Sequence, residues 1–361
     1  MKRFSLILCL CLFGMLIVPD GRACTSFVMQ GDGRIYFGSN LDWRWENGLI
    51  IVNKRGVKKA SLVQPGNQPA EWISRYGSVT FNQFGQEMPF GGMNEAGLVV
   101  EQMWLDSTRY PARDSRPAVN LLEWIQYQLD NCRTVEEVLA TDSKIRLEAP
   151  PVSARVHYLV SDASGNCASI ECLDGRLVCH CGKDLPFHAL ANNTYENSLA
   201  YARAHPDPGT ENHPLWRTGS EHRFARATAR VIRFEPSNPT NEVQYAFDTL
   251  NQVHQWATKW RIVYDVSAHQ IHLRTHDNPR ERTIDLQSLD FSCGHPAQFA
   301  NIDAKPSADG QLEFQDLTMA AQQAYLHDFS TKPAVRRVFG DLSKQIGALM
   351  LLVQSYTCAD K

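Results

Sequence analysis

The chain has 361 residues, which is enough for one large domain or two small ones. Its formal net charge of −3 gives no support to a nucleic-acid partner, because nucleic-acid-binding domains are typically basic. The sequence shows no internal repeat, and no apolar stretch beyond the N-terminal one reaches membrane-spanning length.

The N-terminal segment has the layout of a secretory signal peptide. A basic start precedes an apolar run of fifteen residues at 4–18, and small residues follow at Gly21 and Ala23. The run is shorter than the about 20 residues that a spanning helix needs. We expect residues 1–23 to be removed, leaving a secreted or periplasmic mature domain, residues 24–361, with no membrane span. An uncleaved membrane anchor is the alternative.

The mature sequence opens with strand patterns. Apolar and polar residues alternate at 24–30 and 34–41 around a turn at Gly31–Gly33, which predicts a β-hairpin. Similar patterns predict later strands over residues 49–52, 77–81, 98–103, 155–160, 260–265 and 270–275.

Helical patterns lie between and after these strands. Pro117 followed by apolar residues on one face predicts a helix over 118–132. Thr218 to Glu221 resembles a capping box that starts a helix ending near Phe234. The other predicted helices are 135–140, 196–204, 241–255 and 317–326. Runs of strands flanked by helices indicate an α+β fold with antiparallel sheets.

Eight of the ten cysteines remain after removal of the signal segment. Four of them surround Asp174-Gly175, a strong hairpin signal, within the stretch CASIECLDGRLVCHC. If Leu173 faces Arg176, this hairpin places Cys167 on one face and Cys172, Cys179 and Cys181 on the other. The four ligands then do not converge with the usual zinc spacing, and we predict no metal. A free Cys24 leaves seven others, an odd number, so at least one more is unpaired or bonds between chains.

A cysteine directly after a signal cleavage site gains two functional groups. Its thiol can attack a carbonyl, and its new α-amine, with a pKa near 7.7–8.0, can accept the proton. A three-residue turn at Gly31–Gly33 would set Cys24 opposite Asn40 and bring Asp42 onto the same face, where it could hold the amine. A register slip of one residue would move Asp42 to the other face.

Five motifs occur in the order typical of one known family. They are C-T-S-F at 24–27, F-G-S-N-L-D-W at 37–43, G-G-M-N-E-A-G-L at 91–98, A-N-N-T at 191–194 and R-F-A-R-A at 223–227. Together they resemble the choloylglycine hydrolases, or linear amide C–N hydrolases, which include bile salt hydrolases and penicillin V acylases. The resemblance extends from Cys24 to at least Cys293 and includes E-C-L-D-G-R-L at 171–177 and W-R-I-V-Y-D at 260–265.

The resemblance implies a fold and a set of catalytic residues. The fold is the four-layer αββα sandwich of N-terminal nucleophile hydrolases, an α+β architecture with two stacked, mainly antiparallel sheets. Position by position, Cys24 matches the nucleophile, Asp42 the aspartate beside the amine, Asn192 an oxyanion ligand and Arg223 a supporting arginine. On its own, the spacing of Arg223 with later arginines on the same helix is typical of a solvated face.

Two positions depart from the family pattern. Most members have an arginine three residues before the aspartate, and this chain has Ser39, so Arg44 is a candidate replacement for the missing cation. At a position where many bile salt hydrolases place a second oxyanion asparagine, this chain has Trp104. A backbone N–H group would then complete the oxyanion site.

We therefore expect a secreted cysteine amidase that acts on a small-molecule amide and needs no cofactor. The apolar wall for the acyl group would come from Trp43, Trp45, Met103 and Trp104. Conjugated bile salts are the first expected substrate, with penicillin V or N-acyl homoserine lactones as alternatives. An inactive binding protein on the same scaffold is an alternative of another class. A homo-oligomer is also compatible with the sequence.

Overall fold

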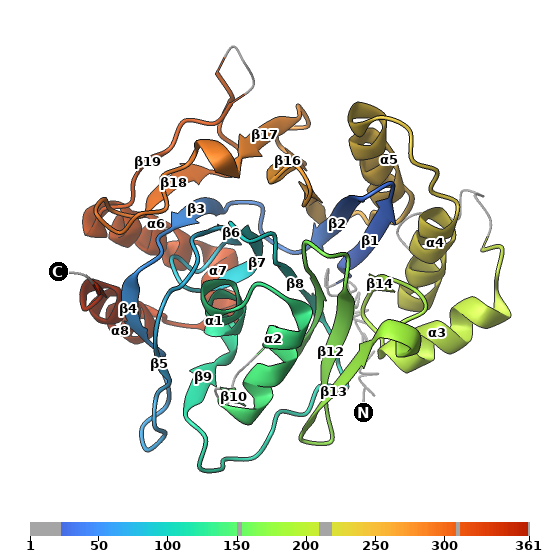
Figure 1. The fold of residues 1–361 in the computed structure, drawn as a ribbon. Coiled ribbons are helices and arrows are strands. Elements are labelled where there is room, and N and C mark those ends of the chain that lie inside the picture. The colour runs from blue at the N-terminus through green and yellow to red at the C-terminus, as the bar shows by residue number, and fades with distance from the viewer. Residues whose placement is uncertain (1–22, 150–153, 209–218, 308–310, 360–361) are drawn as a thin grey trace, which may run out of the picture.

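The computed structural model describes residues 23–149, 154–208, 219–307 and 311–359. The signal peptide predicted at 1–23 lies outside the described residues, apart from Ala23. Two large antiparallel sheets stack on each other in the middle of the molecule, and helices cover both outer faces (Figure 1).

The first sheet contains six strands, and it begins and ends with segments that are distant in sequence. Its spatial order is β14 (Ala189–Leu190), β1 (Thr25–Gly31), β2 (Arg34–Asp42), β15 (Thr258–Asp265), β16 (Gln270–Thr275) and β17 (Arg282–Asp285). Strands β1, β2 and β15 are almost wholly buried, because helices cover one face and the second sheet covers the other.

The second sheet contains nine strands. Its order is β13 (Arg176–Cys181), β12 (Cys167–Leu173), β11 (Val156–Ser161), β8 (Val99–Trp104), β7 (Pro89–Asn94), β6 (Ser78–Asn82), β3 (Leu49–Asn53), β18 (Gln298–Asn301) and β19 (Gln315–Asp316). Two small sheets lie beside it. One pairs β9 (Ala118–Asn120) with β10 (Arg146–Glu148), and the other contains β20 (Thr357–Cys358), β4 (Val57–Ala60) and β5 (Glu71–Ile73).

Helices form the outer layers. On the first sheet α4 (Ser220–Ile232) and α5 (Pro239–Gln252) pack directly, with α3 (Tyr195–Ala204) beside α4. On the second sheet lie α1 (Trp124–Asn131) and α2 (Val135–Ala140). One apolar core fills the space between the sheets and under α3–α5, and another lies under α1 and α2. The result is the expected four-layer αββα sandwich.

The C-terminal part adds a group of helices at the edge of the second sheet. These are α6 (Met319–Thr331), α7 (Pro333–Phe339) and α8 (Ser343–Gln354). A disulfide between Cys293 and Cys358 ties the end of the chain back to the body. Short 3₁₀ turns occur at Leu121–Glu123, Thr141–Ser143, Gly182–Asp184 and Leu286–Ser288. Within the described part of the chain, no helix combines the length and apolarity needed to cross a bilayer.

The predicted hairpin register at the N-terminus is wrong by one residue. The turn has two residues, Asp32 and Gly33, both with positive φ, and not three. This turn geometry suits the right-handed twist of the flanking strands. Thr25, and not Cys24, therefore lies opposite Asn40.

The start of the predicted helix 118–132 is also wrong. Ala118–Asn120 is a strand that pairs with β10, and the α-helix begins only at Trp124. The Asn120 side chain accepts a hydrogen bond from the backbone N–H of Leu122, so it ends the extended segment and caps the following turn.

The predicted capping box falls partly on Thr218, which lies outside the described residues. Helix α4 has Gly219 as its N-cap, with no side-chain cap. The predicted solvated face of α4 is wrong as well. Arg223 and Arg226 are buried, and only the later arginines of the stripe approach the surface.

The cysteine hairpin has the predicted register, with Leu173 opposite Arg176. Because side chains alternate along a strand, Cys172, Cys179 and Cys181 share one face and Cys167 lies on the other, as predicted. Among the described residues, the cysteines outside the disulfide are free thiols: Cys24, Cys132, Cys167, Cys172, Cys179 and Cys181.

Candidate active site

The residues matched to the family's catalytic set meet at one end of the first sheet. Cys24 directly precedes β1, Asp42 is the last residue of β2, Asn192 follows β14, and Arg223 lies in the first turn of α4. Figure 1 shows β1 and β2 next to β14 and α4. Asp42 is fully buried, Cys24 and Arg223 are 6% and 2% exposed, and Asn192 is half-buried. Sequence positions far apart are thus brought into one polar cluster inside the fold.

Arg223 connects the cluster. Its Nη1 donates to the carbonyl oxygen of Cys24 at 2.8 Å, and also to the carbonyl of Ala23 and to Thr25 Oγ1. Its Nη2 donates to Asn192 Oδ1 at 2.7 Å. These acceptors compensate the loss of hydration that a buried guanidinium suffers.

The contact with Arg223 also fixes the orientation of the Asn192 amide. Since Oδ1 accepts from Arg223, the Nδ2 group is left to donate, and it donates to the carbonyl oxygen of Trp104 at 2.8 Å. The backbone N–H of Asn192 donates to Ser220 Oγ at 2.7 Å. Asn192 is therefore held in one orientation and is joined to the main chain of Cys24 through Arg223. An amide N–H of this kind can stabilise developing negative charge on oxygen.

Asp42 lies in a strongly polar but water-excluded position. Its Oδ1 accepts from Thr258, while Oδ2 has no hydrogen-bond partner among the described residues. Burial raises the pKa of Asp42 to about 7, and Arg223, Thr258 and Arg261 oppose that rise. A new cation beside this carboxylate would be strongly favoured, because an opposite charge stabilises the ionised form.

The Cys24 thiol is held in its neutral form while Ala23 is still attached. Its Sγ lies 3.9 Å from the carbonyl oxygen of Asp42. Burial raises the pKa of Cys24 to about 12, and repulsion by Asp42 adds to the effect. The thiolate, and not the thiol, is the nucleophile, so burial of this thiol opposes its activation.

The corrected register changes the geometry expected for Asp42. Strand alternation places the side chain of Asp42 on the face of Thr25 and Asn40, toward α4 and α5, while the side chain of Cys24 is on the opposite face. Asp42 lies across from position 23 of the paired strand. From this position the Asp42 carboxylate still acts on the Cys24 thiol, whose pKa it raises by repulsion.

The predicted apolar wall is only partly assembled. Trp43 and Trp45 contact each other edge to face at 5.8 Å between ring centroids, and Trp43 also contacts Phe90 at 6.0 Å. Met103 is buried in the same apolar core as Cys24. The ring of Trp104 is held elsewhere, since its Nε1 donates to Asp106 Oδ1 at 2.7 Å. What Trp104 brings to the cluster is its carbonyl oxygen.

Sequence reasoning missed three residues of this region. Thr258 and Arg261 come from β15 and act on Asp42, and Glu101 comes from β8 in the second sheet. The stretch W-R-I-V-Y-D at 260–265 was a signal of the family, but its chemistry depends on which strand pairs with β2. Local patterns do not give that pairing.

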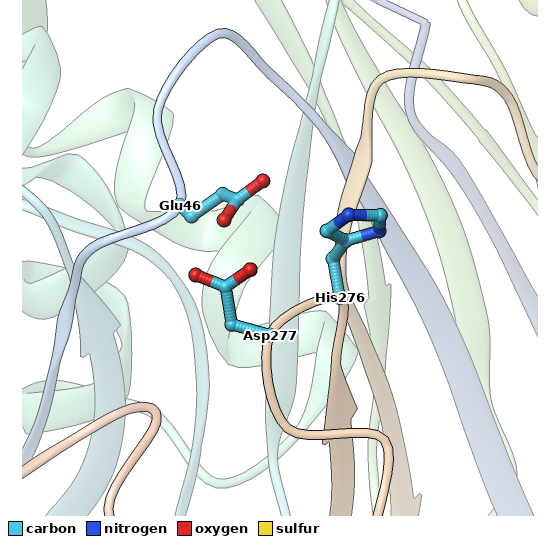
Figure 2. Close-up of side chains that lie close together, drawn as sticks. All are labelled: Glu46, His276 and Asp277. Atoms are coloured by element: carbon cyan, nitrogen blue, oxygen red, sulfur yellow. The ribbon is translucent and has the colours of Figure 1, made fainter.

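One cluster of side chains has the composition of a cation site. Figure 2 shows the carboxyl groups of Glu46 and Asp277 facing each other beside the ring of His276. One ligand atom from each lies within 4.8 Å of the others. The carboxylate of Glu46 already accepts from Lys259 Nζ at 2.5 Å, and the other two residues are exposed. We assign no metal to it.

Comparison with known proteins agrees with this geometry. Residues 24–201 match the family described as linear amide C–N hydrolases, choloylglycine hydrolase family. The chain is 27% identical over 316 residues to a penicillin V acylase of Pectobacterium atrosepticum, covering 75% of this chain and 82% of the relative.

Solved structures show the same fold. Penicillin V acylase from Agrobacterium tumefaciens superposes with a TM-score of 0.67 at 27% identity, over 76% of this chain and 90% of that one. A conjugated bile acid hydrolase from Clostridium perfringens gives a TM-score of 0.62 at 16% identity, over 82% of this chain and 100% of that one. At 16% identity, the similarity to the bile acid hydrolase is evidence for the fold alone.

Together, these matches define an enzyme that hydrolyses carbon–nitrogen bonds in linear amides of small molecules. Over residues 24–201 the chain is similar to the choloylglycine hydrolase family.

Proposed function

We propose that the mature protein is a cysteine amidase whose N-terminal residue, Cys24, carries both nucleophile and base. The observation that carries this proposal is the Arg223 guanidinium, which joins the main chain at Cys24 to the side chain of Asn192. Nucleophile and oxyanion donor are thereby held in one rigid unit, as catalysis by preorganised groups requires.

Cleavage after Ala23 would convert the buried cluster into the working site. The new α-ammonium group appears next to Asp42, whose Oδ2 then gains a charged donor. Arg223 loses one acceptor, the carbonyl of Ala23, and keeps its contact with Cys24. In its neutral form the α-amine takes the proton of the thiol and becomes the ammonium that Asp42 stabilises, and the thiolate attacks the amide carbon.

The remaining steps balance without a cofactor. The oxyanion of the tetrahedral intermediate is stabilised by the Asn192 amide, a donor worth about 2.7–4 kcal/mol in comparable enzymes. The leaving amine departs with the proton that the α-ammonium returns to it, and a thioester remains on Cys24. Water, deprotonated by the same amine, attacks the thioester and releases the acid.

For the acyl group we propose a flat aromatic or apolar unit, with penicillin V as the first substrate. Two relatives at 27% identity are penicillin V acylases, and the Trp43–Trp45 pair beside Asp42 suits an aromatic ring. Conjugated bile salts, the first choice on the sequence resemblance, become the second candidate.

A substrate panel tests the proposal. Penicillin V, glycocholate, taurocholate and long-chain N-acyl homoserine lactones are each incubated with mature protein, and the released amine is quantified. We expect penicillin V to be cleaved, with kcat/KM about 10–200-fold above the others, because apolar contacts discriminate only modestly. Preference for a bile salt would refute the choice of acyl group.

The control pair separates the amidase from an inactive binding protein. Cys24→Ser should abolish turnover with folding retained, whereas Cys181→Ser, at an exposed thiol of the hairpin, should leave it unchanged. If no substrate is cleaved by protein whose N-terminus is confirmed as Cys24, the result favours the inactive binding protein over the amidase.

We propose that the protein works outside the cytoplasm, secreted or periplasmic. The layout of residues 1–23 supports export, and the Cys293–Cys358 disulfide is typical of proteins that fold in an oxidising compartment. Fractionation of the producing cells with mass spectrometry of the N-terminus tests this. A cytoplasmic chain that still begins at Met1 would contradict it.

A further inference from the structure

A buried carboxyl group from the second sheet contacts two residues of the first sheet. Glu101 of β8 is 6% exposed, and by strand alternation its side chain shares the inter-sheet face with Met103. Tyr264 Oη donates to Glu101 Oε1 at 2.5 Å, and the hydroxyl of Ser39 also donates to this carboxyl group. Both partners belong to the first sheet, so Glu101 is a polar link between the sheets.

A chain of hydroxyl groups points at this carboxyl group. Ser26 Oγ donates to Ser39 Oγ at 3.0 Å, and Ser39 donates in turn to Glu101. On the neighbouring strand β7, Gly91 lies directly opposite Glu101. A Cβ atom at Gly91 would come within 2.2 Å of the carboxyl carbon, so the glycine leaves the space that Glu101 fills.

The network includes Ser39, one of the two positions where this chain departs from the family pattern. Ser39 stands where most family members have an arginine, three residues before Asp42. In this chain Ser39 is hydrogen-bonded to the carboxyl group of Glu101. A neutral serine beside an acidic group therefore stands where an arginine would supply a fixed positive charge. The electrostatic environment of Cys24 is therefore different from one that contains an arginine.

We propose that Glu101 is a positioning residue of the amidase site: its carboxyl group joins Tyr264 to the Ser39–Ser26 pair, two residues along the chain from Cys24, and adds to the negative charge that the thiolate meets. This inference rests on the proposed role of Cys24 as nucleophile. It concerns the ionisation of the thiol, which can be measured without any substrate.

The physical effect has a definite sign. Burial raises the pKa of Glu101 to about 8, with Tyr264 and Ser39 opposing the rise. Below that pH Glu101 is neutral; above it the carboxylate repels a thiolate at Cys24, as Asp42 also does. Arg223 acts in the opposite sense on the same thiol. Glu101 should thus make Cys24 harder to ionise as the pH rises through 8.

The test measures alkylation of Cys24 by iodoacetamide in the mature protein, read from the mass of the N-terminal peptide, over pH 6–10. Glu101→Gln keeps the hydrogen-bonding shape but cannot ionise. We expect it to shift the midpoint of the alkylation profile downward by about half a pH unit, less than a directly contacting charge would give, because Glu101 acts on the thiol more weakly than Asp42 and Arg223 do. The pH profile of kcat/KM should move in the same direction.

Glu123→Gln is the matched control. Glu123 is a buried carboxyl group whose pKa burial also raises to about 8, but it contacts Ser61 and Leu62, far from the site. This variant should keep the wild-type alkylation profile. If Glu101→Gln does not fold, Tyr264→Phe replaces it, because loss of the donor keeps Glu101 protonated to higher pH and shifts the midpoint downward too.

Two results would overturn the inference: an unshifted profile in the folded Glu101 or Tyr264 variant, or an equal shift in the Glu123 variant. Failure of the proposed function would look different. In that case either no substrate would be cleaved by the mature protein or Cys24→Ser would retain turnover, whereas the alkylation profile of Cys24 would still report whether Glu101 acts on its thiol.

Discussion

Among single residues, two arginines determine the properties of the site: Arg223 connects its members, and Arg261 supplies a positive charge near Asp42. Arg223 binds both Cys24 and Asn192, so its position in α4 decides the geometry of the oxyanion donor. Arg261 of β15 lies opposite Asn40 and lowers the pKa of Asp42 against the effect of burial. It is a better candidate than the exposed Arg44 for the cation that Ser39 does not supply.

Replacing Asn192 tests the oxyanion donor. Asn192→Ala should reduce kcat/KM by about 10²–10³-fold, the usual cost of one such donor, with little change in thermal stability. Asn193→Ala, at the adjacent residue whose amide contacts Glu221, is the control and should stay near wild type. Equal losses in both variants would indicate a loop defect and no specific role for Asn192.

Replacing the two arginines decides which one serves Asp42. A nearby cation favours the ionised carboxylate, so its removal raises the pKa of Asp42. In Arg261→Ala the acid limb of the kcat/KM profile should therefore move to higher pH, whereas Arg44→Ala should leave the profile in place. The opposite pattern would assign the role to Arg44.

At the scale of elements, the C-terminal helices are joined to the aromatic residues near the site. Trp45 contacts Phe329 of α6 and Phe339 of α7, with ring centroids 5.9 and 5.5 Å apart. The Cys293–Cys358 disulfide fixes the end of the chain that follows α8. Helices α6 and α7 thus pack against Trp45, and the disulfide fixes the chain that follows them.

The disulfide should stabilise the fold without taking part in the chemistry. Cross-linking residues 65 positions apart restricts the unfolded chain, an effect of about 4 kcal/mol in the loop-entropy description. The double variant Cys293→Ser, Cys358→Ser should lower the free energy of unfolding toward that amount, measured by urea denaturation, and keep kcat. Unchanged stability would show that the C-terminal helices hold themselves in place.

Local patterns predicted most elements and missed those that depend on distant partners. The strand at 270–275 and the helix at 135–140 have the predicted bounds, because their periodicity and flanking turns are local. Ala118–Asn120 was predicted as helix, but pairing with β10 determines its extended form. In the site, the N-terminal motif drew attention to Cys24 and Asp42, while Glu101 and Arg261 are placed by strand order, which no local pattern contains.

At the scale of the whole molecule, several carboxyl groups are buried at a cost that depends on pH. Burial raises the pKa of Asp42 and Glu87 to about 7, and of Glu101 and Glu123 to about 8. A folded-state pKa above the unfolded value means that the folded chain binds more protons between the two values. Each such group therefore weakens the fold as the pH rises from its ordinary pKa to its folded value, which is about 7 for Asp42 and Glu87 and about 8 for Glu101 and Glu123.

Glu123→Gln should flatten this dependence, because glutamine does not ionise. Between pH 5 and 8 the free energy of unfolding of the variant should fall less steeply than that of the wild type, by at most about 1.4 kcal/mol per pH unit. Thermal or urea unfolding at several pH values measures the slope. Parallel curves for the two proteins would mean that Glu123 titrates normally in the folded chain.

The proposed mechanism depends on the free α-amine of Cys24, and the most direct measurement compares two forms of one sequence. One form is expressed from Met1 without secretion, and the other carries Cys24 directly after an initiator methionine that the host removes; mass spectrometry verifies both N-termini. In the uncleaved form burial keeps the pKa of Cys24 at about 12 and no α-amine is present at the site. We predict turnover of the preferred amide by the form that begins at Cys24 and none by the uncleaved form. Equal turnover by both verified forms would contradict the mechanism.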